Sequence, residues 1–280
     1  MPRLFVEQLT VIDCAFLDAQ RGLVGESWIV DLELEGELDD QGMVLDFAEV
    51  KKKLKKAVDH VADHKLIVPG KSAQLDLVLS GEGSGLAFRA ATGAIEHQSP
   101  AKALCQIDAE AVTAETLAAH VRKAVQKAAP PNVSGVGLSL RNERIEGSYY
   151  HYTHGLKKHA GQCQRIAHGH RSKLQILING RRDERLERQW ADRWRDIYLG
   201  TSADIVSHGK GRIRFEYRGS EGEFELELPV ERCDLLQTDS TVERIAEHLA
   251  AQIAGERPAG SKIEVRAYEG VMKGAVATAN

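Results

Sequence analysis

Histidine spacing in the second half of the chain fits either a metal site or two surface histidines without a ligand. His168 and His170 open a segment whose alternating apolar residues predict a strand: Leu174, Ile176 and Ile178. Residues i and i+2 of a strand point to the same face, so both imidazoles can reach one metal ion. Upstream, the alternating segment YHYTHGL offers His154 as a third ligand, with His151 and His159 as alternatives. Three neutral imidazoles leave one coordination position open, which is typical of catalytic zinc.

A cysteine lies between the two histidine segments, in the sequence HAGQCQRIAHGH. The thiolate of Cys163 beside a dication would have a lowered pKa and could act as a base or nucleophile. The alternative is a loop cysteine without a role. The remaining cysteines (Cys14, Cys105 and Cys233) are far apart and form no C-x-x-C pair, so a disulfide framework is not expected and small buried hydrophobes are.

Composition excludes several classes of protein. The 280 residues are 42% hydrophobic and 28% charged, which argues against a disordered or fibrous chain. With 37 Lys and Arg against 41 Asp and Glu, the net charge of −4 gives no strong field toward nucleic acid or membranes. The chain has no apolar run of about 20 residues and no secretory signal pattern at its start. We therefore expect a cytoplasmic protein with neither a membrane nor a nucleic-acid partner.

The elements that position these residues repeat along the chain. The alternating segment near 28–36 matches 172–180 at a shift of 144, and the two segments around the glycine-rich turn within 75–88 match 213–226 at a shift of 138. The helical apolar positions of 117–125 match 245–253 at a shift of 128. An ordered series of matches predicts two similar domains, 1–146 and 147–280. Each would run strand, strand, helix, hairpin, helix, strand, which is an α+β fold.

Two helices carry further signals. The first predicted helix has an apolar stripe (Phe47, Val50, Leu54, Val58 and Val61) and a run KKKLKK that we interpret as a solvated face. In the second half, Ser240 and Glu243 have the spacing of a capping box at the start of a helix. Trp190 and Trp194, at i and i+4, are expected to pack in the core or between domains.

Together these motifs resemble the 6-pyruvoyl-tetrahydropterin synthase and 6-carboxytetrahydropterin synthase family, which has the tunnelling (T-fold) architecture. That family shows an F-x-A-x-H strand, a cysteine a few residues before H-G-H, and a V-x-V-x-E strand. Here Tyr150–His154, Cys163 with His168–His170, and Val265–Glu269 stand at these places. In the first half, GMVLDF, a helix and then Asp63-His64 resemble the family's segment that ends in its catalytic Asp-His pair.

The resemblance implies a tandem duplication whose halves are complementary. Phe16, Val24 and Glu26 stand in the first half where the second has its three histidines, and Asn142 stands for Glu269. The first half keeps Asp63 and His64, whereas the shift of 138 gives Thr201 and Ser202 in the second. Since the family's sites lie between neighbouring subunits, we expect one shared site: Zn²⁺ on His154, His168 and His170, with Cys163 and Glu269 from the second half and Asp63 and His64 from the first. Sister sites without zinc would be inactive.

The family also implies roles. Cys163 would be the base, His64 oriented by Asp63 the proton donor or relay, and Glu269 the anchor of the pterin ring. Thr241 could add a polar contact to the pterin, although capping a helix explains it equally well. The basic residues nearest in sequence (Lys157, Lys158, Arg165 and Arg171) are candidates for binding a triphosphate.

The expected activity is that of a zinc-dependent lyase. It would convert 7,8-dihydroneopterin triphosphate to 6-carboxy-5,6,7,8-tetrahydropterin, with acetaldehyde and triphosphate, on the route to 7-deazaguanines such as queuosine. The alternatives are a 6-pyruvoyltetrahydropterin synthase, a non-catalytic pterin-binding module, and a zinc-dependent hydrolase or aldolase acting on a related pterin. T-fold domains join sheet edges into barrels, so a homo-oligomer is expected.

Overall fold

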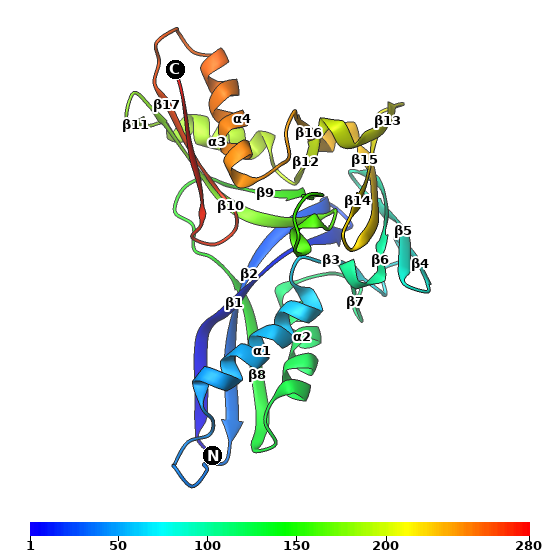
Figure 1. The fold of residues 1–280 in the computed structure, drawn as a ribbon, viewed down its shortest axis with the longest axis vertical. Helices are drawn as coiled ribbons and strands as arrows, with labels where there is room; N and C mark the ends of the chain where they lie inside the picture. Colours follow the sequence, from blue (N-terminus) through cyan, green and yellow to red (C-terminus); the bar gives the residue numbers. More distant parts are fainter.

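The chain folds as an α+β protein of two similar halves in the computed structural model shown in Figure 1. The structure describes the backbone of residues 1–280 and every side chain except those of 47–49, so Phe47 of the predicted apolar stripe lies outside the described side chains. Among the described residues, no helix combines the length and apolar character that crossing a bilayer requires. The α+β class expected from the sequence is confirmed.

In the first half, two long antiparallel strands form the centre of a five-stranded sheet of order β7-β3-β1-β2-β8. Its strands are β1 (Arg3–Asp18), β2 (Gly22–Gly36), β3 (Leu66–Pro69), β7 (Leu104–Ile107) and β8 (Val133–Asn142). Helices α1 (Phe47–Ala62) and α2 (Ala114–Ala128) pack on it. Leu54 and Val58 of α1 are buried while the lysines of KKKLKK are exposed, so the predicted buried and solvated faces of this helix are confirmed.

The second half repeats this plan in a seven-stranded sheet of order β16-β12-β9-β10-β17-β18, with β11 paired to β10. Its strands are β9 (Tyr149–His154), β10 (His168–Ile178), β11 (Arg181–Arg182), β12 (Ile197–Thr201), β16 (Cys233–Leu236), β17 (Ile263–Tyr268) and β18 (Gly274–Ala279). Helices α3 (Glu184–Arg193) and α4 (Val242–Gly255) cover it. Trp190 and Trp194 are buried against this sheet, as expected for core packing.

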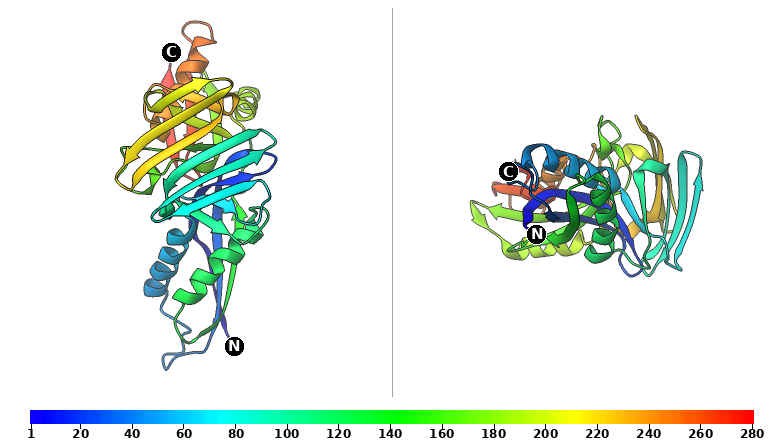
Figure 2. Two further views of the ribbon diagram at one scale, coloured as in Figure 1. Left: turned by 90° about the vertical axis from the view of Figure 1, so that its right-hand side faces the viewer. Right: turned by 90° about the horizontal axis from the view of Figure 1, so that it is seen from below.

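A third sheet joins the two halves and faces the viewer on the left of Figure 2. The first half contributes β4 (Leu75–Ser80), β5 (Gly83–Ala90) and β6 (Gly93–Pro100). The second contributes β13 (Ile205–Gly209), β14 (Arg212–Gly219) and β15 (Gly222–Pro229). Strands β6 and β15 pair at the centre, in the order β13-β14-β15-β6-β5-β4. Each half therefore supplies a three-stranded meander, whereas the sequence predicted a hairpin.

This sheet also corrects the internal repeat. The predicted shift of 138 equates β4 and β5 with β14 and β15, one strand out of step. In the sheet order, the edge strands β4 and β13 correspond, and β5 and β6 correspond to β14 and β15 at a shift of 129. Strands β7 and β16 differ by the same 129 residues. Alternation has a period of two and recurs in every strand of a meander, so slipping by one strand imitates a true match.

The two main sheets approach closely where β2 passes β10. A Cβ atom added at Gly25 would lie 1.9 Å from the carbonyl oxygen of Tyr152, and one added at Gly169 would lie 2.7 Å from the Cα of Gly25. Only glycine allows two backbones to approach so closely. The paired glycines therefore fix how the first half meets the second, beside His168 and His170.

Candidate active site

Strand pairing in the second half brings three buried imidazoles together. His154 ends β9 and His168 begins β10, and the register places these two residues opposite each other. His170 follows on the same face of β10, and the ring nitrogens of all three lie within 4.8 Å of one another. The ring centroids of His154 and His168 are 4.4 Å apart. Of the three upstream histidines, His154 is the one that lies beside His168 and His170, since His159 is exposed and His151 hydrogen-bonds through Nδ1 with the Gly25 carbonyl at 2.7 Å.

The surroundings of these imidazoles fit a metal ion. His154 Nδ1 donates to the Ser240 carbonyl at 2.9 Å, and His168 Nδ1 donates to the Arg165 carbonyl at 3.0 Å. Since a carbonyl only accepts, both Nδ1 atoms carry the proton and Nε2 keeps its lone pair. Within the described residues, Nε2 of His154 and both ring nitrogens of His170 are buried without a hydrogen-bond partner, and Nδ1 of His170 lies 3.2 Å from the Asp13 carboxylate. Buried nitrogens without partners are costly unless something binds them, and zinc accepts such a donor set.

Electrostatics favour the neutral, metal-binding form of two of these rings. Burial, reinforced by the charge of His170, lowers the pKa of His154 well below its ordinary value. Burial and the charge of His154 do the same to the pKa of His168. A ligand that has no proton to lose binds a cation without competition, so these histidines are prepared for a metal at neutral pH.

The first half of the same chain delivers an Asp-His pair to this cluster. His64 Nδ1 lies 2.8 Å from the Asp63 carboxylate, and the His64 ring centroid is 5.0 Å from that of His168. His64, Cys163 and His168 form a second group of side chains within 4.8 Å of one another. Burial opposes protonation of His64, but hydrogen bonds to Asp63 and Cys163 outweigh it and raise the pKa to about 10. His64 is therefore an imidazolium at neutral pH.

The backbone around His64 is held in an unusual conformation. His64 has φ +52°, in the left-handed region that non-glycine residues seldom adopt. Its N–H donates to the Asp13 carbonyl at 2.8 Å, and the Asp13 N–H donates to the Asp63 carboxylate at 2.9 Å. The Arg165 guanidinium donates to the His64 carbonyl at 3.4 Å. Strained backbone persists where neighbours over-determine it, which is common at functional sites.

The two groups of candidate ligands share His168, whose Nδ1 is already engaged with a carbonyl. Its one remaining nitrogen can bind a metal in only one of them. With a metal on the group of three histidines, His64 and Cys163, which contact each other, would stay free of it.

Glu269 lies directly after β17 and close to the same region. Its carboxylate is 3.9 Å from Lys273 Nζ, and its backbone N–H donates to the Lys273 carbonyl at 2.9 Å. Burial, followed by the charge of Glu269, raises the pKa of Tyr150. Its predicted counterpart Asn142 pairs with Trp28, consistent with the shift of 144 between β2 and β10.

The start of α4 differs from the sequence prediction. The N-cap is Thr241, whose hydroxyl accepts from the Arg244 N–H at 3.4 Å, and not Ser240. Ser240 instead serves His154 through its carbonyl and, at 3.2 Å, its hydroxyl. The helix thus accounts for Thr241, and contact of its hydroxyl with a pterin stays a prediction.

The basic residues expected to bind a triphosphate all have partners within the chain. Lys157 pairs with Asp204, Lys158 with Asp239 at 2.6 Å, and Arg165 with Glu221 at 2.7 Å. Arg171 donates to the Glu143 carbonyl at 2.9 Å and lies over the ring of Tyr149. A cation already matched to a carboxylate attracts a polyanion weakly, so this expectation receives no support from the structure.

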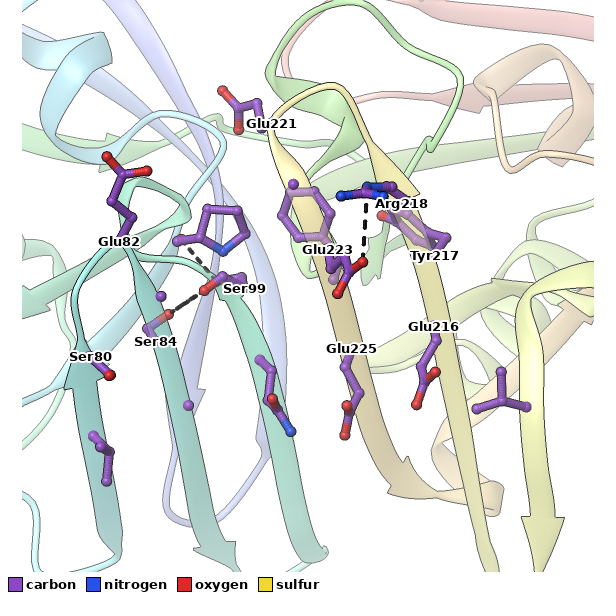
Figure 3. A pocket seen from close by; sticks show the side chains of 18 residues that line it. Ser80, Glu82, Ser84, Ser99, Glu216, Tyr217, Arg218, Glu221, Glu223 and Glu225 are labelled. Atoms are coloured by element: carbon purple, nitrogen blue, oxygen red, sulfur yellow. Dashed lines mark hydrogen bonds and ion pairs between the residues drawn. The ribbon is translucent and has the colours of Figure 1, made fainter.

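A large groove of about 870 Å³ lies over the third sheet, where the two meanders meet (Figure 3). Carboxylates line it, among them Glu216, Glu223 and Glu225, which pair with Arg214 or Arg218. None of the clustered histidines lines this groove, so it is distinct from the candidate site.

The counterpart of His64 in the second half is Asp196, not the predicted Ser202. Leu66 pairs with Ala15 in the first half as Tyr198 pairs with Thr153 in the second, which equates β3 and β12 at a shift of 132. Asp196 has φ +55°, matching the +52° of His64. The same backbone device therefore occurs twice, once with an imidazole and once with a carboxylate.

Sequence reasoning missed Asp13 and Lys273 and assigned Ser240 to a helix cap, although all three lie around the candidate site. Asp13 alone gave a signal: a carboxylate in the otherwise apolar strand segment VIDCAF, where a buried charge needs a partner. The partners of Ser240 and Lys273 are distant in sequence and no local pattern indicates them.

Comparison with known proteins agrees with the resemblance stated above. Residues 18–144 match the family model described as 6-pyruvoyl tetrahydropterin synthase. Among solved structures, 6-pyruvoyl tetrahydropterin synthase of Plasmodium vivax matches with 22% identity and a TM-score of 0.39, over 51% of this chain and 98% of that one. The Plasmodium falciparum enzyme matches with 20% identity and a TM-score of 0.40, over 50% and 90%. No curated protein sequence matches this chain significantly. Residues 18–144 of this chain are therefore similar to the 6-pyruvoyl tetrahydropterin synthase family.

Proposed function

We propose that this protein is a zinc-dependent lyase that converts 7,8-dihydroneopterin triphosphate and one water molecule to 6-carboxy-5,6,7,8-tetrahydropterin, acetaldehyde and triphosphate. The family domain supports a pterin-related lyase as the general activity. The observation that carries the specific proposal is the meeting, within one chain, of His154, His168 and His170 with the Cys163, His64 and Asp63 group. A module that only binds pterins has no need of a thiol and an imidazolium beside a metal position.

The three histidines would hold Zn²⁺ through Nε2, because Nδ1 of His154 and of His168 is committed to a carbonyl and that of His170 faces Asp13. The ion would supply Lewis acidity that makes the proton on the substrate's side-chain carbon easier to remove. Cys163 would take that proton as the base. His64 carries a proton at neutral pH and returns one to the substrate, and Asp63 keeps its ring oriented.

Glu269 would hold the pterin ring by accepting hydrogen bonds from a ring N–H and the exocyclic amino group. A carboxylate suits this pair of parallel donors. The contact of Lys273 with Glu269 keeps an acceptor charge in place at the end of β17. Because Asp63 and His64 lie beside the histidines of their own chain, we propose that each chain contains one complete set of these groups.

The test is a product assay on purified, zinc-loaded protein incubated with 7,8-dihydroneopterin triphosphate and followed by mass spectrometry. Formation of 6-carboxytetrahydropterin and acetaldehyde is the expected result. A 6-pyruvoyl product would keep the proton-transfer roles and change the product assignment. An unchanged substrate in a sample with one zinc per chain would reject catalysis and favour a pterin-binding module. The matched control is Cys163→Ser, which should keep its zinc and lose turnover.

A further inference from the structure

We infer that Asp13, from the first half of the chain, is a positioning residue for the metal site of the second half. Its carboxylate orients His170 for the metal, and its backbone fixes the Asp63–His64 pair at the same place. The inference rests on the proposed zinc site, and it concerns a residue that does not touch the metal or the substrate.

The contact with His170 differs in kind from those of the other two candidate ligands. Asp13 Oδ1 lies 3.2 Å from His170 Nδ1, whereas His154 and His168 use backbone carbonyls. A carboxylate on the far nitrogen of a ligating imidazole fixes its tautomer and raises its basicity. Of the three rings, His170 is thus the one that faces a carboxylate, and that carboxylate comes from the other half of the molecule.

Asp13 is itself held firmly. It is buried, and the Ser27 hydroxyl donates to its Oδ1 while Lys273 Nζ lies 3.5 Å from its Oδ2. Gly270, with φ +69°, packs so closely that an added Cβ would lie 2.5 Å from Oδ1. A buried carboxylate with a hydroxyl, a cation and a tight wall around it has little freedom to rotate away from His170.

The main chain of the same residue contacts the Asp-His pair. The Asp13 N–H donates to the Asp63 carboxylate at 2.9 Å, and the Asp13 carbonyl accepts from the His64 N–H at 2.8 Å. The side chain on one side and the main chain on the other therefore determine how far the imidazolium lies from the metal position. A single residue of β1 links the groups that the two halves contribute.

The related place in the molecule provides a control. Asp13 corresponds to His151 and His170 corresponds to Glu26, and this pair also meets, with His151 Nδ1 3.8 Å from the Glu26 carboxylate. The acid and the base have exchanged strands, so neither group touches a metal position. Removing the Glu26 charge therefore changes a buried acid–imidazole contact without changing a ligand of the metal.

The experiment measures zinc affinity by competition with a chromophoric chelator, for the wild type, Asp13→Asn and Glu26→Gln. Asp13→Asn keeps the volume and both backbone contacts and removes the charge. We expect its zinc dissociation constant to rise about 10- to 100-fold, with Glu26→Gln within about threefold of the wild type. Circular dichroism establishes that each variant is folded, and the visible spectrum of the cobalt-substituted protein should change in Asp13→Asn alone.

A folded Asp13→Asn protein with wild-type zinc affinity would overturn the inference, as would an equal loss in Glu26→Gln. Should Asp13→Asn fail to fold, Ser27→Ala provides the second test, because it leaves the charge and removes the hydroxyl that fixes it. We expect a smaller loss of zinc affinity there, and an unchanged value would count against the inference. Failure of the wild type to bind zinc is a separate outcome that rejects the proposed function itself.

Discussion

The two halves of this molecule contain two equivalent places, built on the same strand pairs but lined by different side chains. At one, His154, His168 and His170 surround the proposed metal position beside His64. At the other, the corresponding residues are Phe16, Val24, Glu26 and Asp196. The strand pairing is the same, since Phe16 faces Val24 as His154 faces His168. Even the left-handed backbone of His64 recurs at Asp196.

The difference lies in how each place satisfies its buried polar groups. At the second place, Asp196 accepts two hydrogen bonds from Arg21 and lies 3.7 Å from Arg232, and Phe16 stacks on Trp28. Every strong charge there has a protein partner. At the first, buried imidazole nitrogens lack one. Backbone geometry alone therefore does not make a site, and the unmet bonding capacity of the side chains distinguishes the two places.

The sharpest way to break this comparison is to remove a ligand on one side and its counterpart on the other. His168→Ala should abolish stoichiometric zinc binding and lower turnover by at least about 10³-fold, since Lewis acidity contributes several kcal/mol. Val24→Ala should keep both zinc and turnover and lose only stability, by about 1–2 kcal/mol. Metal analysis and the product assay measure the two effects. Zinc retained in His168→Ala would show that the metal is bound elsewhere.

A second pair of variants addresses the repeated left-handed residue. His64→Ala should lower turnover by about 10²- to 10⁴-fold, the range of general acid–base catalysis, with zinc content unchanged. Asp196→Asn should destabilise the fold, because it weakens a buried ion pair, yet leave turnover of the folded protein intact. Equal turnover in His64→Ala and the wild type would reject the shared site.

The third prediction concerns the seam between the two halves, which is the close approach of Gly25 in β2 to the backbones of β9 and β10. Gly25→Ala should reduce the free energy of unfolding by about 3 kcal/mol or more, because the new methyl group meets the Tyr152 backbone and not a flexible side chain. The control is Gly255→Ala, at the end of α4, where an added Cβ meets nothing within 4 Å and should be neutral or slightly stabilising. Urea unfolding compares the two, and equal midpoints would contradict the importance of the seam.

The sequence was informative wherever the deciding contact is local. Two histidines at i and i+2 on one strand had to share a face, and the structure brings His168 and His170 together with His154. The Asp-His pair was recognised from a motif, and its place beside the histidines of its own chain was open until the fold was known. Both predictions, the cluster of histidines and the Asp-His pair, depended on residue types at a fixed spacing in the sequence.

Contacts between distant segments could not be predicted in this way. The shift of 138 in the meander region was wrong because alternation cannot distinguish neighbouring strands. The same shift was used to align His64, so it wrongly gave Ser202 as its counterpart. The His170 imidazole that faces the Asp13 carboxylate is 157 residues away, on a strand of the other half. Such pairs depend on how β1 and β2 meet β10, which no local pattern encodes.

The smallest expected effect comes from pH, and it separates the two places by their charges. Burial raises the pKa of Glu26 to about 7 from 4.5, although the Ser27 N–H and the charges of Arg171 and Arg21 oppose this. Between those values the folded protein holds a proton that the unfolded chain has released, so wild-type stability falls as pH rises. The loss amounts to at most about 3 kcal/mol, at 1.36 kcal/mol for each pKa unit.

Glu26→Gln removes this titration while its amide oxygen can still accept from the Ser27 N–H. Its free energy of unfolding, minus that of the wild type, should therefore increase from pH 5 to pH 8, with most of the change complete near pH 7. Burial lowers the pKa of His151 to about 4, so His151 makes the free energy of unfolding rise with pH between about pH 4 and 6.5. Because both proteins contain His151, subtracting one curve from the other removes its contribution. Urea unfolding at several pH values, with zinc in excess throughout, measures the difference. Parallel curves would mean that Glu26 has the same pKa in the folded and the unfolded protein. The electrostatic contrast between the two places would then be lost.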